Sequence, residues 1–238
     1  MKRLILVACL FLAGVAGQFA LLRARAAASP VAADGVIAAL GGFRSLAAEA
    51  VWFRADRLQD EGRYVELAQL ATTLTFLEPR VPEVWSYAAW NLAYNISVMM
   101  PTHEDRWRWV LASMRLLRDD GLGLNPHCAE LYRELAWLFE LKIGADIDSA
   151  ASLYREKWRA LVADVASRDA WSELAMDRAT MDEVSDIYGV TDWTHPQASA
   201  IYWAHSGLRY AGERDRAFLN EILKQALVIY RKTSNMVK

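Results

Sequence analysis

Apolar residues recur every three to four positions along most of the chain after Gly42, the spacing that places them on one face of an α-helix. No stretch keeps the alternating apolar and polar pattern of a half-buried strand for more than a few residues. Proline ends helices because it lacks the N–H donor, and here it stands between the periodic runs, at Pro79, Pro82, Pro101, Pro126 and Pro196. The pattern predicts an all-α fold.

The periodic runs form consecutive pairs separated by short turns, which predicts antiparallel helical hairpins. The expected pairs are Leu46–Glu61 with Tyr64–Leu77, Pro82–Val98 with Glu104–Asp119, Cys128–Ile143 with Ile147–Ala166, and Gln197–Ala211 with Asp215–Lys232. Residues 167–196 interrupt this order, and their breaks at Gly189 and Pro196 predict an irregular helical insertion before the last pair.

A repeated pattern of large and small residues marks the first helix of each pair. Gly62 precedes Pro79 by seventeen residues, a turn–helix–stop spacing. Three later first helices carry, between large residues, a pair whose second member is small: Trp85-x2-Ala88-Ala89-x2-Leu92, Tyr132-x2-Leu135-Ala136-x2-Phe139 and Trp203-x2-Ser206-Gly207-x2-Tyr210. The first unit has Val51, Arg54, Ala55 and Leu58 at these places. On these residues the chain resembles the tetratricopeptide-repeat (TPR) family, whose first helix carries W-x2-L-G-x2-Y.

The resemblance implies a short TPR-like solenoid, in which stacked hairpins share one core and the first helices line a concave face. The repeats are diverged. Pro79 and Pro126 are 47 residues apart, longer than the family period of about 34 residues, and an insertion falls around Met99–His103. The curvature of the array therefore does not follow from the family average.

An uncharged, mostly apolar run, residues 4–22, lies between Lys2-Arg3 and Arg23. Nineteen helical residues extend ~28 Å, close to the thickness of a bilayer core, so the run predicts a transmembrane anchor in the lipid bilayer. The alternative is a secretory signal peptide, because the small residues before Ser29 would suit a signal peptidase. Cys9 lies in a lipobox-like setting, but thirteen further residues of the run follow it, and we do not expect lipidation.

These features divide the chain into a signal-anchor or signal peptide (residues 1–28), a linker rich in Ala and Gly (29–44) and a helical-repeat domain (45–238). Lys2, Arg3 and the terminal amine outnumber the cationic groups after the run, Arg23 and Arg25. The positive-inside rule then keeps the N-terminus cytoplasmic and places the folded domain on the periplasmic or exterior side. Signal cleavage would instead give a secreted protein.

Charge argues against nucleic acid as a partner. The first thirty residues hold four of the 27 basic residues and none of the 29 acidic ones, so the remainder carries 23 basic and 29 acidic residues, a net charge of −6. Nucleic-acid binding favours the opposite sign. One of the two cysteines lies in the apolar run, which leaves Cys128 alone in the folded part without a disulfide partner.

No motif for catalysis, cofactor binding or metal binding stands out. The four histidines form no H-E-x-x-H pair. Asp146-x-Asp148 lacks the glycine and the later glutamate of a calcium loop, and we interpret Asp146 as the N-cap of a helix beginning at Ile147. We therefore expect no cofactor and no metal. An acid–base pair among Asp119, Asp146 and Asp182 stays open, since sequence gives no distances.

Asn91 and Asn95 are the most unusual polar residues, because they share one face of an otherwise apolar and aromatic helix. Either they bind the loop near Pro101 and fix it, or they contact a ligand, as Asn on the concave face of helical repeats can do. Trp107 and Trp109 point about 200° apart, so one should be buried and the other partly exposed. The candidate partner-binding residues are Asn91, Asn95, Arg106 and Trp107.

The sequence thus predicts a membrane-tethered helical-repeat scaffold, not an enzyme, that binds a protein or peptide partner at the cell envelope. An obligate structural subunit of a membrane transport or secretion complex is the alternative, and an enzyme on an α/α array is the third hypothesis. The assignment to a scaffold depends on the family resemblance, because fold alone does not determine function.

Overall fold

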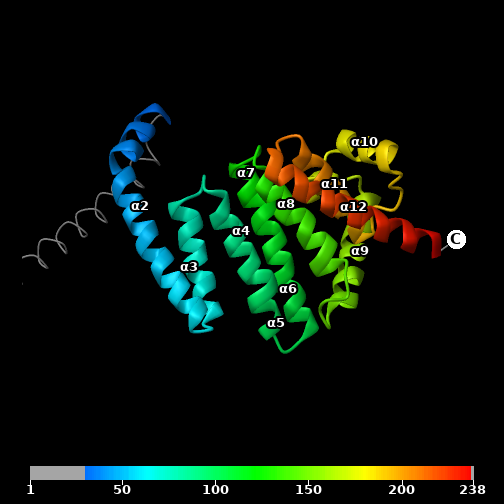
Figure 1. Cartoon of the computed structure of the whole chain (residues 1–238), viewed down its shortest axis with the longest axis horizontal. Helices are drawn as coiled ribbons and strands as arrows, with labels where there is room; N and C mark the ends of the chain where they lie inside the picture. Colours follow the sequence, from blue (N-terminus) through cyan, green and yellow to red (C-terminus); the bar gives the residue numbers. More distant parts are fainter. Residues whose placement is uncertain (1–29, 237–238) are drawn as a thin grey trace, which may run out of the picture. The chain divides into compact units, whose positions relative to one another are not determined.

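The computed structural model describes the backbone of residues 30–236 and the side chains of residue 44 and residues 46–233. Every regular element in this part of the chain is a helix (Figure 1), which confirms the predicted all-α class for the described residues. The apolar run 4–22 lies outside them. Between residues 30 and 236, no helix combines the length and apolar character needed to cross a membrane.

The chain divides into two compact units, Met1–Asp56 and Arg57–Lys238. The described part of the first unit belongs to α2, which runs without interruption from Pro30 to Asp60. The sequence predicted a linker over residues 29–44 and a helix beginning at Leu46. Continuous helix there is consistent with the alanine content of this segment, since alanine has the highest helix propensity and each interior glycine costs only about 1 kcal/mol.

The second unit contains the remaining helices. In order they are α3 (Tyr64–Leu77), α4 (Pro82–Trp90), η1 (Asn91–Ile96), α5 (Ser97–Met99), α6 (His103–Arg115), η2 (Leu116–Gly121), α7 (Leu122–Leu124), α8 (Ala129–Trp137), η3 (Leu138–Ile143), α9 (Ala151–Ser167), η4 (Trp171–Leu174), α10 (Arg178–Tyr188), α11 (Pro196–Leu208) and α12 (Glu213–Met236). The segments η1, η2 and η3 are π-helical turns that continue the helix before them, and η4 is a 3₁₀ helix.

Local signals in the sequence explain where these helices begin and end. Pro82 and Pro196 each occupy the first turn of a helix, where the missing N–H costs nothing. Thr102 caps α6 by accepting the Asp105 N–H at 3.1 Å. Gly189 ends α10 with φ +76°, in the left-handed region that glycine adopts without strain. The irregular insertion predicted for residues 167–196 is η4 and α10.

The start of α9 differs from the prediction. The helix predicted to begin at Ile147 begins at Ala151, so Asp146 is not its N-cap; its carboxylate pairs with Arg155 on the surface instead. Residues 144–150 form a turn, and the carboxylate of Asp148 accepts the Ala150 N–H at 2.9 Å. Neither aspartate is the N-cap of α9, since the residue at that position is Ala150, and Asp148 instead holds the turn before it.

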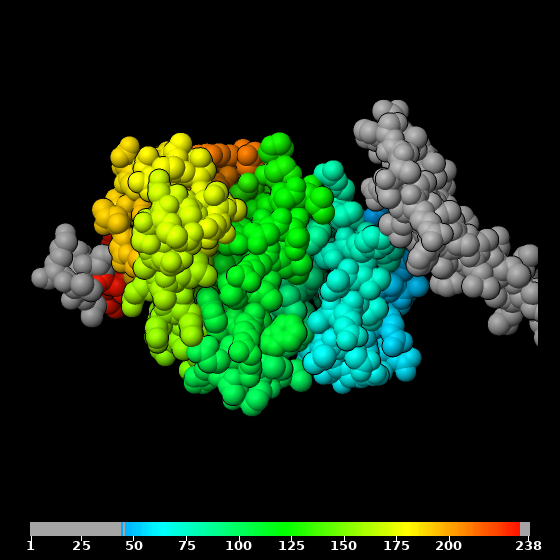
Figure 2. All heavy atoms as spheres, turned by 180° about the vertical axis from the view of Figure 1, so that it is seen from behind, coloured from blue at the N-terminus to red at the C-terminus, as the bar shows by residue number. Residues whose placement is uncertain are grey.

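Within the second unit, neighbouring helices pack in a chain of contacts: α3 against α4, α4 against α6 and α8, α8 against α11, and α11 against α12 (Figure 1). From the opposite side the residues of α6 lie between those of α3 and α9 (Figure 2). The core is aromatic as well as aliphatic. Phe139 packs on Trp158 with ring centroids 4.6 Å apart, and Tyr154 is fully buried.

The small residues of the repeated pattern lie where helices approach most closely. Ala88, Ala89 and Ala136 are buried. At Gly207 in α11, an added Cβ atom would come within 2.7 Å of Tyr132 Cβ in α8 and 3.1 Å of Leu219 Cδ1 in α12. Glycine is thus required for this three-helix contact.

Candidate functional site

A groove of about 350 Å³ lies beside α4, η1 and α8. The helix formed by α4 and η1 contributes Ser86, Tyr87, Trp90, Asn91 and Asn95 to its lining. Glu134 and Trp137 come from α8, and Gln59 comes from the last turn of α2. All eight residues belong to the second compact unit. The groove is therefore built mainly by two first helices of the predicted hairpins.

Helical periodicity explains how α4 and α8 present these side chains. Ser86 and Trp90 are four residues apart, and Glu130, Glu134 and Trp137 follow one another at intervals of four and three residues on α8, so each set shares a helix face. The Ser86 hydroxyl donates to Glu130 Oε1 at 2.9 Å, which links the two helices directly. This bond fixes the helix register that places Trp90 and Trp137 along the same groove.

Two tryptophans leave large aromatic surfaces accessible in the groove. Trp90 is 52% exposed and Trp137 is 39% exposed. One side of the Trp90 ring packs on Tyr94, with centroids 4.9 Å apart and planes inclined by 30°. Exposed tryptophan is unusual on a protein surface that contacts only water, whereas it is enriched at binding interfaces.

The two asparagines are fixed by the helix packing. Asn91 is only 2% exposed, and its Nδ2 donates to the Tyr64 carbonyl of α3 at 3.3 Å. Asn95 Nδ2 donates in turn to Asn91 Oδ1 at 3.0 Å. The alternative that they bind the loop near Pro101 is wrong, because their amides bond Tyr64 and each other. Arg106 holds that loop instead, since its Nε donates to the Met100 carbonyl at 3.1 Å.

Glu134 is a mostly buried carboxylate in the groove wall. Its side chain is 18% exposed, and Oε1 accepts from Arg133 Nε at 3.3 Å and Nη2 at 3.0 Å. Oε2 accepts no hydrogen bond from any described residue. Burial raises the pKa of Glu134 above its usual range, although the Arg133 guanidinium partly opposes this effect. Arg133 also pairs with Asp215 of α12, so its charge is shared between two acids.

The hydroxyl of Tyr94 lies below the groove and has no hydrogen-bond partner among the described residues. A small cavity of about 10 Å³ adjoins it and shares Trp90, Glu134 and Trp137 with the groove. That volume is close to the about 10–15 Å³ needed for one water molecule. Burial, and then the charges of Glu134 and Glu140, raise the pKa of Tyr94 and keep it protonated.

The four residues chosen from the sequence fall into two places. Asn91 and Asn95 line the groove, whereas Arg106 and Trp107 do not. Trp107 is 7% exposed and packs against Tyr154, with ring centroids 6.1 Å apart. Trp109 is partly buried, which confirms the expected division between the two tryptophans. The structure therefore does not form one pocket from all four residues.

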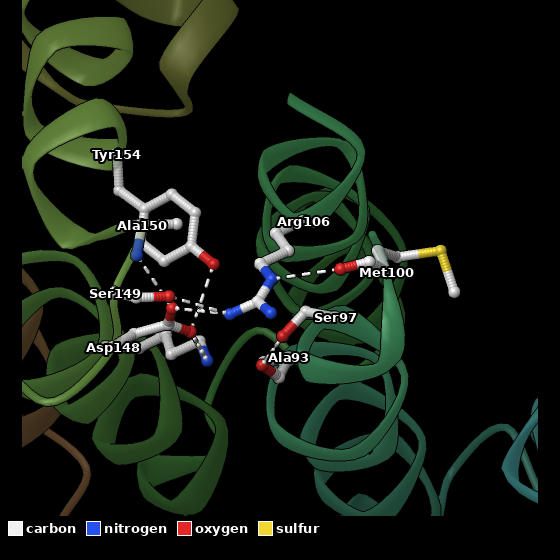
Figure 3. Close-up of polar contacts among 9 residues, drawn as sticks. Ala93, Ser97, Met100, Arg106, Asp148, Ser149, Ala150 and Tyr154 are labelled. Carbon is white, nitrogen blue, oxygen red and sulfur yellow. Dashed lines mark hydrogen bonds and ion pairs between the residues drawn. The ribbon is translucent and has the colours of Figure 1, made fainter. Parts of the chain in front are cut away.

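Arg106 belongs instead to a buried ionic cluster at the turn before α9 (Figure 3). Asp148 is its centre: Oδ2 accepts from Lys142 Nζ at 2.6 Å and from the Tyr154 hydroxyl at 3.1 Å. Arg106 Nη1 lies 3.2 Å from Oδ1 and also donates to Ser149 Oγ at 3.1 Å. The cluster thus connects α6, η3 and α9.

Electrostatics keep Asp148 ionised in this cluster. Burial alone would raise its pKa, but hydrogen bonds from Lys142, the Ala150 N–H and Tyr154 outweigh burial and lower the pKa to about 2. The Lys142 ammonium also lies 5.2 Å from the centre of the Tyr94 ring, a cation–π distance. The charged groups of this cluster pair with one another, so we interpret the cluster as structural. Through the contact of Lys142 with Tyr94, it also supports the helix that carries Asn91 and Asn95.

Trp90, Glu134 and Trp137 were not predicted from the sequence as groove residues, nor was Lys142 predicted as a buried cation. One signal was present for Lys142, which with Glu140 is one of two charged residues among the apolar residues of Leu138–Ile143. Among the residues with described side chains, no three His, Cys, Asp or Glu residues are grouped closely enough to hold a metal ion.

Comparisons of the chain with protein-family models, curated proteins and solved structures found no match.

Proposed function

We propose that this chain is a membrane-tethered helical-repeat scaffold that binds a protein or peptide partner at the cell envelope. The binding site is the groove beside α4, η1 and α8. Residues 4–22 would anchor the chain in the bilayer and leave the folded part on the extracytoplasmic side. The observation that carries the proposal is the pair of exposed tryptophans, Trp90 and Trp137, in one groove.

These tryptophans fit the energetics of protein recognition. Binding energy at protein interfaces is concentrated in a few residues, often Trp, Tyr and Arg, that enter pockets and exclude water. The side chain of Trp90 is already restricted, since its ring packs on Tyr94. A rigid aromatic surface loses little conformational entropy when a partner covers it. The volume of about 350 Å³ suits a few side chains of a partner.

The proposal includes a diverged TPR-like arrangement of the second unit. Its hairpins would be α4–α5 with α6–α7, α8–η3 with α9, and α11 with α12. The contacts of α8 with both α4 and α11 support this order, because first helices of successive repeats adjoin one another in such arrays. The groove then corresponds to part of the concave surface.

Site-specific photo-crosslinking of the full-length chain in its native membranes tests the proposal. A photoreactive phenylalanine analogue would replace Trp137 in the groove or Ile187 on α10, which is 56% exposed and lies outside the groove. We expect a defined protein adduct from position 137 and none from position 187. Equal adducts from both positions, or none from position 137, would contradict a binding site in the groove.

The same material separates the scaffold from an obligate subunit. A scaffold should remain folded and monodisperse after its partner is removed, because its groove is a local feature of a packed helical unit. Aggregation upon removal of the partner would favour a structural subunit whose apolar surface is permanently covered.

A further inference from the structure

We infer that the groove selects a basic side chain: a lysine or arginine of an extended peptide lies between Trp90 and Trp137, with its cationic end at Glu134. This inference rests on the proposed function and names the chemistry of the partner. Three observations carry it: the charge of the lining, the free oxygen of Glu134 and the exposed indole faces.

The lining of the groove has a negative bias. Glu134 is its charged residue, and no lysine or arginine lines it. Glu130 lies one helical turn away and bonds Ser86, a lining residue, which adds a second negative charge nearby. The Arg133 guanidinium is directed to Glu134 and Asp215 and so offers little attraction to an anion. Complementary charge favours a cationic ligand and disfavours a free carboxylate.

The carboxylate of Glu134 is incompletely compensated. Its contacts with Arg133 both use Oε1, while Oε2 accepts no hydrogen bond from a described residue although the side chain is mostly buried. Oε2 is not one of the fully buried polar atoms that lack a partner, so a ligand in the groove can reach it. An ammonium or guanidinium group at Oε2 would supply the missing donor through a short, charge-assisted hydrogen bond.

The aromatic groups complete a site for a cation. The free face of Trp90 and the exposed ring of Trp137 border the same groove as Glu134. Tryptophan attracts cations most strongly among the aromatic residues, and a guanidinium group also stacks on its ring. The aliphatic part of a lysine or arginine side chain would cover indole surface while its charged end reaches the carboxylate.

A sugar is the other ligand class that stacks on tryptophan, but the polar groups of this groove suit it less well. Of the two lining asparagines, Asn91 is not free to bind a sugar hydroxyl, because it uses its amide nitrogen on Tyr64 and its amide oxygen on Asn95. A neutral glycan would also leave Glu134 without a cation. The observations therefore favour a basic peptide.

Fluorine NMR of the full-length chain in detergent, labelled with 5-fluorotryptophan, tests the inference. Trp90→Phe and Trp137→Phe assign the two resonances. The probes are the blocked pentapeptides Ala-Ala-Arg-Ala-Ala and Ala-Ala-Lys-Ala-Ala, with Ala-Ala-Gln-Ala-Ala and chitotriose as comparisons. We expect the two basic peptides to shift both resonances, and the glutamine peptide and chitotriose to leave them unchanged at equal concentration.

Glu134→Gln should weaken the basic peptides about tenfold, because the amide keeps the shape but removes the charge that pairs with them. Glu183→Gln is the matched control, because the Glu183 side chain of α10 is partly exposed and lies outside the groove, and it should leave their affinity unchanged. If Glu134→Gln impairs folding, Trp137→Leu provides the second variant, since Trp137 is partly exposed; it should also weaken the basic peptides.

The inference is overturned if the glutamine peptide binds as well as the arginine peptide, if chitotriose shifts the two resonances, or if Glu134→Gln leaves the affinity of a folded protein unchanged. Its failure is distinguishable from failure of the proposed function. A partner adduct at position 137 together with no preference for basic peptides would retain the scaffold and reject the basic ligand. Absence of both would reject both.

Discussion

Lys142 Nζ lies 2.6 Å from Asp148 Oδ2, and both side chains are almost completely buried, with exposed fractions of 2% and 3%. Two charges removed from water lose hydration energy that their attraction only partly restores. The remaining oxygen of Asp148 is therefore important: it accepts the Ala150 N–H and faces Arg106. The pair holds the turn before α9 against η3 and α6, in an arrangement that a purely apolar turn would not specify.

Loss of Lys142 should strongly destabilise the fold. Lys142→Met leaves the buried Asp148 carboxylate with Arg106 as its remaining cation, and we expect the free energy of unfolding to fall by about 3–5 kcal/mol. Urea denaturation followed by circular dichroism measures this change. The matched control is Arg155→Gln, which breaks the exposed pair with Asp146 and should cost less than about 1 kcal/mol. Equal effects of the two substitutions would contradict a special role for the buried pair.

The same pair makes an acid-dependent contribution to stability. Asp148 has a pKa of about 2 in the folded chain, against about 3.9 for an unfolded aspartate. A depressed folded-state pKa gives stability that is fully present above pH about 4 and is lost as pH falls towards 2. The carbon chemical shift of the Asp148 carboxyl should titrate with a midpoint near pH 2. The advantage of wild type over Asp148→Asn in unfolding free energy should shrink across that window, and a midpoint near 4 would exclude the proposed pairing.

How far sequence predicts this structure depends on whether a feature is local. Pro82 begins a helix as predicted, because proline acts on its own turn. The Lys142–Asp148 pair is also close in sequence, but choosing Asp148 over Asp146 depends on the turn geometry, which no local rule supplies. Asn91 stood out because an amide on an apolar helix face is conspicuous.

The other groove residues depend on tertiary register. Trp90 and Glu134 come from helices 44 residues apart, and the Ser86–Glu130 hydrogen bond, with the same sequence separation, aligns them. Nothing in either segment alone shows that they face one groove. Arg106 shows the opposite error. It was grouped with Asn91 because the two are near each other in sequence, but its position on α6 directs its side chain to Asp148.

Gly207 provides a test of the helix packing. Gly207→Ala would place a Cβ atom 2.7 Å from Tyr132 Cβ, so α8 and α11 would have to separate. We expect a loss of about 1–3 kcal/mol in unfolding free energy, as is typical for an overpacked core. Gly123→Ala in α7 is the control, because nothing lies within 4 Å of its added Cβ. That variant should be neutral or up to about 1 kcal/mol more stable, and a neutral Gly207→Ala would argue against close contact of the helices.

The membrane anchor is a prediction from residues 4–22 alone, and removal of residues 1–28 tests it. The full-length chain should remain in the membrane pellet after alkaline carbonate extraction, whereas a chain beginning at Ser29 should be released. A helical run of nineteen uncharged, mostly apolar residues is long enough to span the bilayer core, which is the physical reason for retention. N-terminal sequencing of the mature full-length protein distinguishes the alternatives, since cleavage near Ser29 would identify a signal peptide.

Trp90 and Trp137 should matter for binding far more than for folding. Both rings are about half exposed, so replacing both with alanine removes much less buried surface than replacing Trp158, which is 2% exposed. We expect the double variant to lose less unfolding free energy than Trp158→Ala, for which about 3–5 kcal/mol is typical. Its affinity for the partner captured from position 137 should nevertheless fall at least about tenfold, because exposed aromatic anchors dominate interface energy. Surface plasmon resonance with that partner and thermal unfolding measure the two quantities separately. Ile187→Ala should change neither, and a double variant that loses stability but keeps its affinity would show that the tryptophans serve packing and that the partner binds elsewhere.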